Sequence, residues 1–374
     1  MKIGIEAQRI FRTKKHGMDI VVLELIKALQ KIDLENQYFI FVKKGIDICL
    51  QETENFKIIE VPGFTYADWE QIFLPIYASK YKLDLLHCTS NTAPLLYPGK
   101  TVVTLHDVIF LENQTKSTSS NWYQSLGRVY RKLVVPTSIK KATQIITVSE
   151  FEKKRITEIL NINSENVQVI YNAYGNHFNK SLNVDRISEV KKRYNLPENY
   201  IFYIGNTDPK KNIFNTLRAY RTYCIGAIEP LSLVIADINE EFLKNVLELT
   251  NTKSLRNRIQ LTGYILNADL PAIYSGADVF LYPSTRESFG IPLLEAMASG
   301  TPVITGNMSA LPEIAGDAAL FVDPYNEKNI GETLIRLLSD IGLKEAMANK
   351  GLIHCKKYNW LSSASNLLIT YKNN

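Results

Sequence analysis

The chain has 374 residues, 45% hydrophobic and 22% charged, as in a globular protein, and this length predicts two or three domains. No apolar run reaches the roughly 18–20 residues of a membrane span, and four scattered cysteines without a CxxC or His/Cys cluster indicate neither a zinc site nor a disulfide framework. The net charge of +5 lies in residues 1–180, which contain 23 Lys and Arg against 18 Asp and Glu. This excess favours an anionic substrate or a membrane surface, or reflects only a solvated surface. The chain has no basic stripe interleaved with aromatic residues, so the charge does not indicate a nucleic-acid partner.

The first half of the chain alternates short strands with helical patterns. Its start, MKIGIEAQRI, resembles a strand and lacks the features of a signal peptide, so we expect a cytoplasmic protein. Helices are predicted at 18–30 and 149–160, the latter with Ser149 as N-cap and Glu152 at the capping-box position. Further strands are predicted at 38–42, 56–62, 83–88, 101–107, 143–149 and 167–171. This alternation predicts a parallel sheet covered on both faces.

A polar segment with few aliphatic residues, 175–198, is predicted to link this half to a second unit of the same kind. The strands of that unit are predicted at 200–206, 231–237, 258–263, 278–284, 301–306 and 318–323. We therefore expect domains at 1–175 and 176–355, followed by a C-terminal helix within 356–374 that packs back on the first domain. Doubly wound sheets bind ligands beyond the carboxyl ends of their strands, so a cleft between two such sheets is the expected site.

The segment RESFGIPLLEA, 286–296, joins a predicted strand to a predicted helix that begins near Pro292. The first N–H groups of such a helix can bind an anion. Glu287 precedes the helix and Glu295 lies about one turn inside it, so both can border the anion. Carboxylates in such a place can bind a diol, such as ribose or a sugar ring. The residues alone leave open whether Glu295 is only a solvent-facing helix residue.

With its E-x7-E spacing, ADVFLYPSTRESFGIPLLEAMASGTPVITG resembles the core of the retaining glycosyltransferases of family 4. The resemblance extends in the expected order over SALPEIAGDAALFVDP (309–324), LTGYI (261–265), YIGNTDPKKN (203–212), ITVSEFEKKRI (146–156), HCTSNTAPL (87–95) and VTLHD (103–107). It implies the GT-B fold, an α/β architecture of two Rossmann-like doubly wound domains facing a central cleft, with the acceptor in the first domain and the donor in the second. It also implies a metal-independent transferase that moves a sugar from a nucleotide-diphosphate sugar to an acceptor.

The resemblance also assigns roles to the two glutamates. Glu295 matches the glutamate that binds the ribose hydroxyls, and Glu287 matches the one that contacts the donor sugar. The backbone amides that help to hold the sugar and diphosphate are those around Phe289, Gly290 and Ile291.

Lys211 matches the lysine that holds the donor diphosphate after the first strand of the second domain. Many members of the family pair it with an arginine directly after a glycine of that strand. Here Gly205 is followed by Asn206, which takes the place of the arginine as a candidate donor-binding residue, and Lys210 is the candidate for the second charge. The alternative for Lys210 and Lys211 is that they are two ordinary surface lysines with no role in binding.

The resemblance also places residues near three other parts of the donor, namely the reacting sugar, the diphosphate and the base. The resemblance implies that His106 lies near the reacting sugar, that Gly17 approaches the diphosphate, and that Tyr264 and Ile265 lie near the base. His106 with Asp107 could instead be a structural pair, and Gly17 only a turn. For Ser149 and for Asn172 a capping or hinge role is favoured over a contact with the ligand.

The PKKN and SNTAPL segments resemble bacterial mannosyltransferases of surface polysaccharide synthesis, which makes GDP-mannose the first candidate donor and a UDP-sugar the second. The implied acceptor is a glycan or a lipid-linked saccharide. A lipid carrier would suit the positive first half and would place the enzyme at the inner membrane face as a peripheral protein. The alternatives are a catalytically silent sugar-nucleotide-binding subunit and a GT-B epimerase or phosphorylase. No metal and no cofactor other than the donor are expected.

Overall fold

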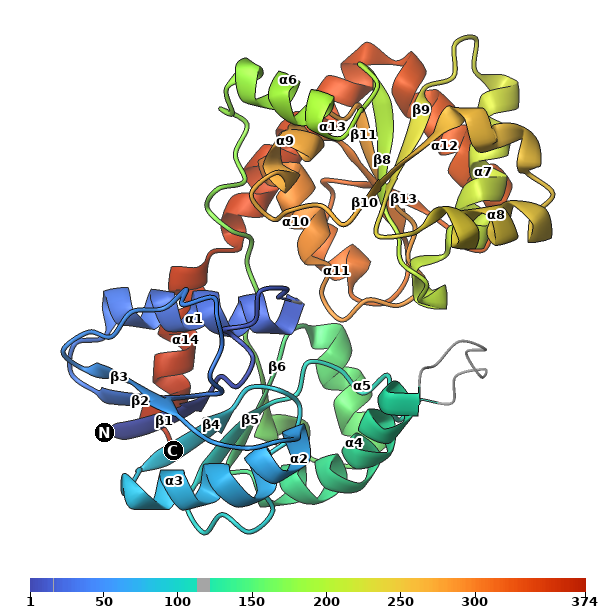
Figure 1. Ribbon diagram of the computed structural model, residues 1–374. Helices are drawn as coiled ribbons and strands as arrows, with labels where there is room; N and C mark the ends of the chain where they lie inside the picture. The colour runs from blue at the N-terminus through green and yellow to red at the C-terminus, as the bar shows by residue number, and fades with distance from the viewer. Residues whose placement is uncertain (16, 113–121) are drawn as a thin grey trace. The chain divides into compact units, whose positions relative to one another are not determined.

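The structure is a computed structural model that describes residues 1–15, 17–112 and 122–374. The chain forms two compact units (Figure 1). One comprises residues 1–173 with 358–374, and the other comprises residues 174–357. These limits lie two residues from the expected boundaries at 175 and 355.

The first unit is built on a seven-stranded parallel sheet in the order β3-β2-β1-β4-β5-β6-β7. Its strands are β1 (Lys2–Glu6), β2 (Gln37–Val42), β3 (Phe56–Glu60), β4 (Leu85–Cys88), β5 (Thr101–Thr104), β6 (Gln144–Thr147) and β7 (Val167–Val169). Successive side chains of the central strands face opposite layers of helices. Leu86 shares a core with α3, α4 and α5, while His87 faces α1 and α14. Burial on both faces explains why these strands are continuous apolar runs.

The helices of the first unit are α1 (Gly17–Ile32), α2 (Tyr66–Asp68), η1 (Trp69–Phe73), α3 (Leu74–Lys80), α4 (Trp122–Lys141), α5 (Glu150–Leu160), η2 (Ser164–Asn166) and α14 (Trp360–Lys372). The side chain of Ser149 caps α5 by accepting from Glu152 N at 3.2 Å, as the sequence predicts. The C-terminal helix α14 packs beside α1 on this unit. It is fixed there by Tyr371, whose hydroxyl lies 2.6 Å from Nδ1 of His87.

The second unit is built on a six-stranded parallel sheet in the order β10-β9-β8-β11-β12-β13. Its strands are β8 (Tyr200–Ile204), β9 (Ser232–Ala236), β10 (Ile259–Gly263), β11 (Val279–Tyr282), β12 (Val303–Gly306) and β13 (Leu320–Val322). Its helices are α6 (Val184–Arg193), η3 (Pro209–Lys211), α7 (Ile213–Gly226), α8 (Glu240–Leu249), η4 (Lys253–Arg258), α9 (Leu270–Ser275), α10 (Ile291–Ala298), α11 (Leu311–Ala315), α12 (Glu327–Ser339), α13 (Ile341–His354) and η5 (Cys355–Lys357). On one face, α7, α8 and α12 share an apolar core with the sheet. On the other face, Tyr274 of α9 packs edge-on against Phe202 and Phe280.

The prediction of a linker over 175–198 is wrong for much of that range, because the helix α6 lies within it. Ion pairs hold α6 to the start of α9. Arg193 Nη1 lies 2.9 Å from the nearly buried Asp269 carboxylate, and Arg186 contacts the same carboxylate. Val184, Ile187 and Val190 recur at three-residue intervals in α6 and Asn183 caps the helix, so the sequence carries a helical pattern that the prediction of a linker overlooks.

Within the described ranges, no helix combines the length and the apolar character needed to cross a membrane.

Candidate functional site

Two polar residues far apart in sequence meet at the carboxyl edge of the second sheet. Lys211 follows β8 and Glu287 follows β11, and these two strands are parallel neighbours. Because parallel neighbours end at the same edge of a sheet, the loops that follow them converge. Lys211 Nζ lies 2.7 Å from Glu287 Oε1, which is a direct, charge-assisted hydrogen bond.

The environment of this pair is nearly closed. The side chains of Lys211 and Glu287 are 11% and 10% exposed. Lys211 Nζ also donates to the hydroxyl of Tyr282 at 2.7 Å and lies 4.7 Å from the centre of its ring. Burial raises the pKa of Glu287, but Lys211 and Lys210 lower it by more, so its pKa lies below the ordinary value. Glu287 is therefore a carboxylate at neutral pH, and Lys211 has a fixed position.

Backbone contacts hold the lysine loop against the glutamate loop. Asn212 adopts a left-handed conformation with φ of +65°, and its side-chain amide donates to the carbonyls of Pro283 at 2.9 Å and Pro324 at 2.6 Å. Thr285 N donates to the Lys210 carbonyl at 2.9 Å. The hydroxyl of Tyr203 donates to the Lys211 carbonyl at 2.7 Å. These bonds preorganise both loops.

Asn206 and Lys210 lie on the same loop but are engaged differently. The Asn206 side chain accepts from Asp208 N at 2.8 Å and so shapes the turn after β8. Lys210 Nζ lies 3.9 Å from the Asp208 carboxylate, which is a loose, partly exposed pair. Lys210 is therefore not committed to a close partner as Lys211 is, and its charge still contributes to the low pKa of Glu287.

The helix α10 begins beside Glu287. Gly290, which precedes it, has φ of +99°, and a Cβ atom there would lie 3.1 Å from Leu311 Cδ2, so glycine is required at this turn. Ile291 and Pro292 open the helix, and the N–H groups of a first turn have no acceptors within their own helix. Phe289 is 3% exposed and anchors the loop in the core. The N–H of Glu287 donates to Ser309 Oγ at 3.0 Å.

Glu295 is not a solvent-facing helix residue. It is partly buried in α10, and the hydroxyl of the fully buried Tyr274 donates to its Oε2 at 3.2 Å. Burial raises the pKa of Glu295 to about 7, and the Tyr274 hydroxyl offsets only part of this effect. The side chain therefore titrates near neutral pH.

Tyr264 and Ile265 follow the edge strand β10, and β9 separates that strand from β8. Tyr264 is 51% exposed and Ile265 is 5% exposed. Only Tyr264 thus offers a substantial surface to a ligand, at some distance along the edge from Lys211.

In the first unit, His106 is held at the carboxyl end of β5. Its Nε2 lies 2.9 Å from the Thr89 carbonyl, and its backbone N–H donates to the Asn91 side chain at 2.6 Å. Since a carbonyl can only accept, Nε2 carries the proton and Nδ1 is left as the acceptor. Burial lowers the pKa of His106, so the ring is neutral. Thr89 is fixed in turn by Glu6, whose backbone carbonyl accepts from Oγ1 at 2.7 Å.

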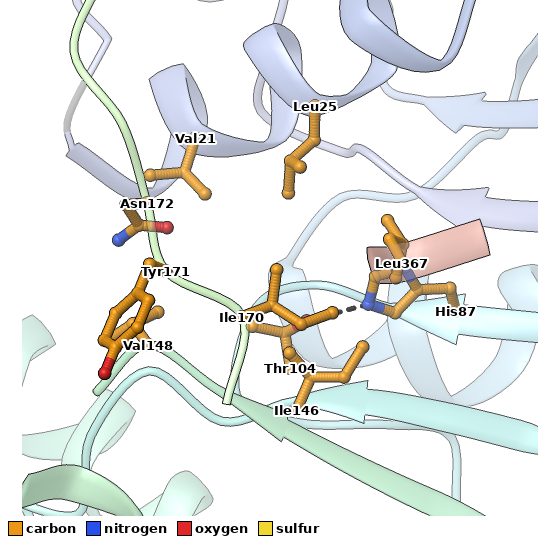
Figure 2. Close-up of a pocket in the computed structure, with 10 residues that line it drawn as sticks. All are labelled: Val21, Leu25, His87, Thr104, Ile146, Val148, Ile170, Tyr171, Asn172 and Leu367. Atoms are coloured by element: carbon orange, nitrogen blue, oxygen red, sulfur yellow. Dashed lines mark hydrogen bonds between the residues drawn. The ribbon is translucent and has the colours of Figure 1, made fainter. Parts of the chain in front are cut away.

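Gly17 is exposed at the start of α1, and a side chain there would meet no atom within 4 Å. Asn172 is 6% exposed and lines a small internal pocket with α1, α14 and His87 (Figure 2). His87 bridges that region: its Nε2 bonds to Thr104 Oγ1 at 2.7 Å, and burial lowers its pKa to about 3. The pocket has a volume of about 10 Å³, enough for one water molecule and far too small for a sugar.

Tyr274, Tyr282 and Ser309 are contacts of the candidate site that sequence reasoning did not identify. Each of them contacts the site through its side-chain hydroxyl alone, and the rest of the residue belongs to the core or to a turn. The sequence signals were the position of Tyr282 at the end of a predicted strand and that of Ser309 at the start of the family-like segment 309–324. Over the described part of the chain, no group of three or more His, Cys, Asp and Glu side chains is placed to hold a metal ion.

Two family models match the chain, one in each half. Residues 16–174 match the model described as Glycosyltransferase Family 4, and residues 185–352 match that described as Glycosyl transferases group 1. Together they account for most of the chain.

Individual proteins agree with the family models. The chain is 27% identical over 274 residues to the O-antigen chain mannosyltransferase B of Escherichia coli, covering 73% of this chain and 70% of that protein. It is 27% identical over 270 residues to the serotype-specific mannosyltransferase WbdA of Escherichia coli, covering 71% of this chain but 32% of WbdA. The structure of Anabaena HepE in complex with UDP-glucose matches over 100% of both chains with a TM-score of 0.75 and 16% identity. That likeness confirms the expected architecture of two Rossmann-like units.

Proposed function

Because the chain belongs to the glycosyltransferases of group 1 and has the GT-B fold, we propose that it moves a sugar from a nucleotide-diphosphate sugar to a glycan or lipid-linked acceptor during synthesis of a surface polysaccharide, with retention of anomeric configuration. The alternatives of a silent binding subunit and of an epimerase or phosphorylase are not favoured, since the relatives described above are named transferases.

The observation that carries the proposal is the Lys211–Glu287 pair beside the N-terminus of α10. When the bond between the sugar and the diphosphate breaks, negative charge develops on the β-phosphate. Fixed positive groups aimed at that phosphate stabilise the transition state, and one such donor is typically worth about 3–4 kcal/mol. In this proposal Lys211 is that donor, with Lys210 and the amides around Phe289, Gly290 and Ile291 beside it.

The two glutamates take the hydroxyl groups of the donor. Glu287 accepts hydrogen bonds from the transferred sugar and keeps Lys211 in place through the bond between their side chains. Glu295 accepts from the ribose hydroxyls, for which its partly buried carboxylate is suited once ionised. Tyr264 and Ile265 are proposed to border the base, and Asn206 to shape the loop near the phosphates.

In the first unit, His106 is proposed to act near the reacting sugar. Its fixed tautomer leaves Nδ1 free to accept a hydrogen bond from a sugar hydroxyl, and its low pKa keeps the ring neutral. Gly17 is proposed to approach the diphosphate, because the absence of a side chain leaves the start of α1 open.

The donor is proposed to be GDP-mannose, in keeping with the mannosyltransferase names of the relatives, with a UDP-sugar as the second candidate because HepE binds UDP-glucose. A thermal-shift screen of GDP, UDP, GDP-mannose and UDP-hexoses distinguishes the two, since a ligand of the native state raises the melting temperature. Stabilisation by guanosine nucleotides alone supports the first assignment, and stabilisation by uridine nucleotides alone refutes it.

The role of Lys211 is tested with Lys211→Ala. We expect a loss of about 10²–10³ in kcat/KM in protein that is still folded, although less stable than the wild type, because one transition-state donor is removed. Lys244→Ala, at an exposed lysine of α8, is the control and should retain wild-type activity. Slow donor hydrolysis without acceptor gives a readout while the acceptor is unknown. Wild-type turnover by Lys211→Ala would contradict the proposal.

Peripheral attachment to an anionic membrane is also proposed, and the surface of α4 supports it. Leu126, Val129 and Leu133 recur at helical spacing and are 56%, 54% and 70% exposed. The exposed Arg128 and Lys132 lie on the same helix. Apolar contacts combined with basic residues favour the surface of anionic lipids.

The attachment is tested by sedimentation with vesicles of phosphatidylglycerol and phosphatidylcholine. The wild type should bind, and the combined Leu126→Ser, Val129→Ser and Leu133→Ser variant should lose most of the binding. Failure of the wild type to sediment with anionic vesicles would refute the attachment.

A further inference from the structure

A basic hollow lies wholly within the first unit, and one of its lining residues reaches the loop after β4, where Arg9 Nη2 lies 3.4 Å from Ser90 Oγ. It has a volume of about 330 Å³, which is within the range of small-molecule sites. Its walls come from the loop after β1 and from the segment that follows β2. Four of its lining residues are cations, namely Arg9, Arg12, Lys43 and Lys44.

The charge of this hollow is only partly neutralised. Arg9 Nε lies 3.0 Å from the Asp19 carboxylate. By contrast, Arg12, Lys43 and Lys44 form no ion pair with a carboxylate in the described part of the chain. Lys43 Nζ donates only to the Phe64 carbonyl, at 3.3 Å. Three cations that share a concave surface raise the local concentration of anions.

Backbone hydrogen bonds hold the two walls of the hollow together. Lys43 N donates to the Gln8 carbonyl, and Asp47 N donates to the Phe11 carbonyl, each at 3.2 Å. Gly45 lies so close to Phe11 that a Cβ atom would be 2.3 Å from the Phe11 carbonyl oxygen. Only glycine permits this approach, so the hollow is preformed.

We propose that this hollow binds a phosphate group of the acceptor. Phosphate carries close to two negative charges and offers several acceptor oxygens, which matches one guanidinium fork and two ammonium groups. The volume accommodates a diphosphate or a hexose phosphate. The assignment of the phosphate to the acceptor rests on the proposed function, in which the donor diphosphate is held by Lys211 in the other unit. Phosphate binding by the hollow itself does not depend on that function.

The test compares two variants that each lose two positive charges. Arg12→Ala with Lys44→Ala alters the hollow, while Lys31→Ala with Lys57→Ala removes exposed lysines from α1 and β3 of the same unit. Inorganic pyrophosphate is titrated calorimetrically into each protein, first alone and then with GDP or UDP at saturation to occupy the donor site. We expect the hollow variant to lose at least tenfold in affinity with nucleotide present, and the control to stay within about twofold of the wild type.

Equal pyrophosphate affinity in the hollow variant and the wild type would overturn the inference, as would an equal loss in the control or complete displacement of pyrophosphate by nucleotide. If neither GDP nor UDP binds, the proposed function fails, but the titrations without nucleotide still test the hollow. Farnesyl diphosphate and glucose 6-phosphate as further probes tell whether the phosphate belongs to a lipid carrier or to a sugar. The inference is supported if the hollow variant loses binding of one of these two probes while the control variant keeps it.

Discussion

Removing one partner of the Lys211–Glu287 pair should lower the free energy of unfolding of the second unit more than removing both partners. The perturbation is a double-mutant cycle of Lys211→Met, Glu287→Gln and the combined variant. In Lys211→Met the carboxylate of Glu287 loses its 2.7 Å partner while it remains about 10% exposed. Such a one-sided loss of a buried ion pair typically costs about 3–5 kcal/mol, whereas replacing both ions by neutral groups of similar size is often close to neutral.

Two neighbouring groups limit the expected penalty of Lys211→Met. Lys210 still lowers the pKa of Glu287 after Lys211 is removed, and the Tyr282 hydroxyl remains beside both positions. These contacts place the penalty of Lys211→Met at the lower end, about 3 kcal/mol. The folded pKa of Glu287 lies below its ordinary value, so the pair contributes stability above the unfolded pKa, and this contribution is lost as the pH falls through the folded pKa.

The assay is urea unfolding of the four proteins at pH 7.5 and at pH 4.5, with the transition of the second unit followed separately. We expect a coupling energy of about 2–3 kcal/mol at pH 7.5 and only a slightly smaller one at pH 4.5, because pH 4.5 still lies above the lowered folded pKa of Glu287. If the effects of the two single changes add to within about 0.5 kcal/mol, the two side chains are not coupled and the expected stabilising ion pair is refuted.

Two further changes test the surroundings of this pair. Glu295→Gln should stabilise the protein at pH 8 by up to about 3 kcal/mol and have little effect near pH 4.5. Burial raises the pKa of Glu295 to about 7, so the stability that this side chain contributes below its unfolded pKa is lost as the pH rises through 7. Urea unfolding midpoints at the two pH values check the sign of the effect. Gly290→Ala should cost about 1–3 kcal/mol and lower nucleotide affinity, because φ is +99° and Leu311 lies 3.1 Å from the added carbon; an unchanged melting temperature and affinity would contradict the required turn.

The strands could be predicted from the sequence because they are buried on both faces. Runs such as 101–107 and 278–284 contain the observed β5 and β11, although the observed strands end two or three residues earlier. The helix α6 carries Val184, Ile187 and Val190 at helical spacing after the N-cap Asn183, and the prediction missed it because its many charged residues resemble those of a linker.

The candidate site was predictable in composition but not in its connections. Glu287 and Glu295 stand out from the sequence, and the order of the strands brings Lys211 to the same sheet edge. The direct bond between Lys211 and Glu287 spans 76 positions and depends on rotamers that no local pattern encodes. The raised pKa of Glu295 depends likewise on its burial next to Tyr274.

The proposed donor site can be tested with a crystal structure of the protein soaked with its nucleotide-sugar donor. We expect the diphosphate to lie within hydrogen-bonding distance of Lys211 Nζ and of the amides at the start of α10. We also expect ribose hydroxyls to contact Glu295 and sugar hydroxyls to contact Glu287. A donor bound elsewhere, or bound here without contact to Lys211 and to either carboxylate, would contradict the proposed site.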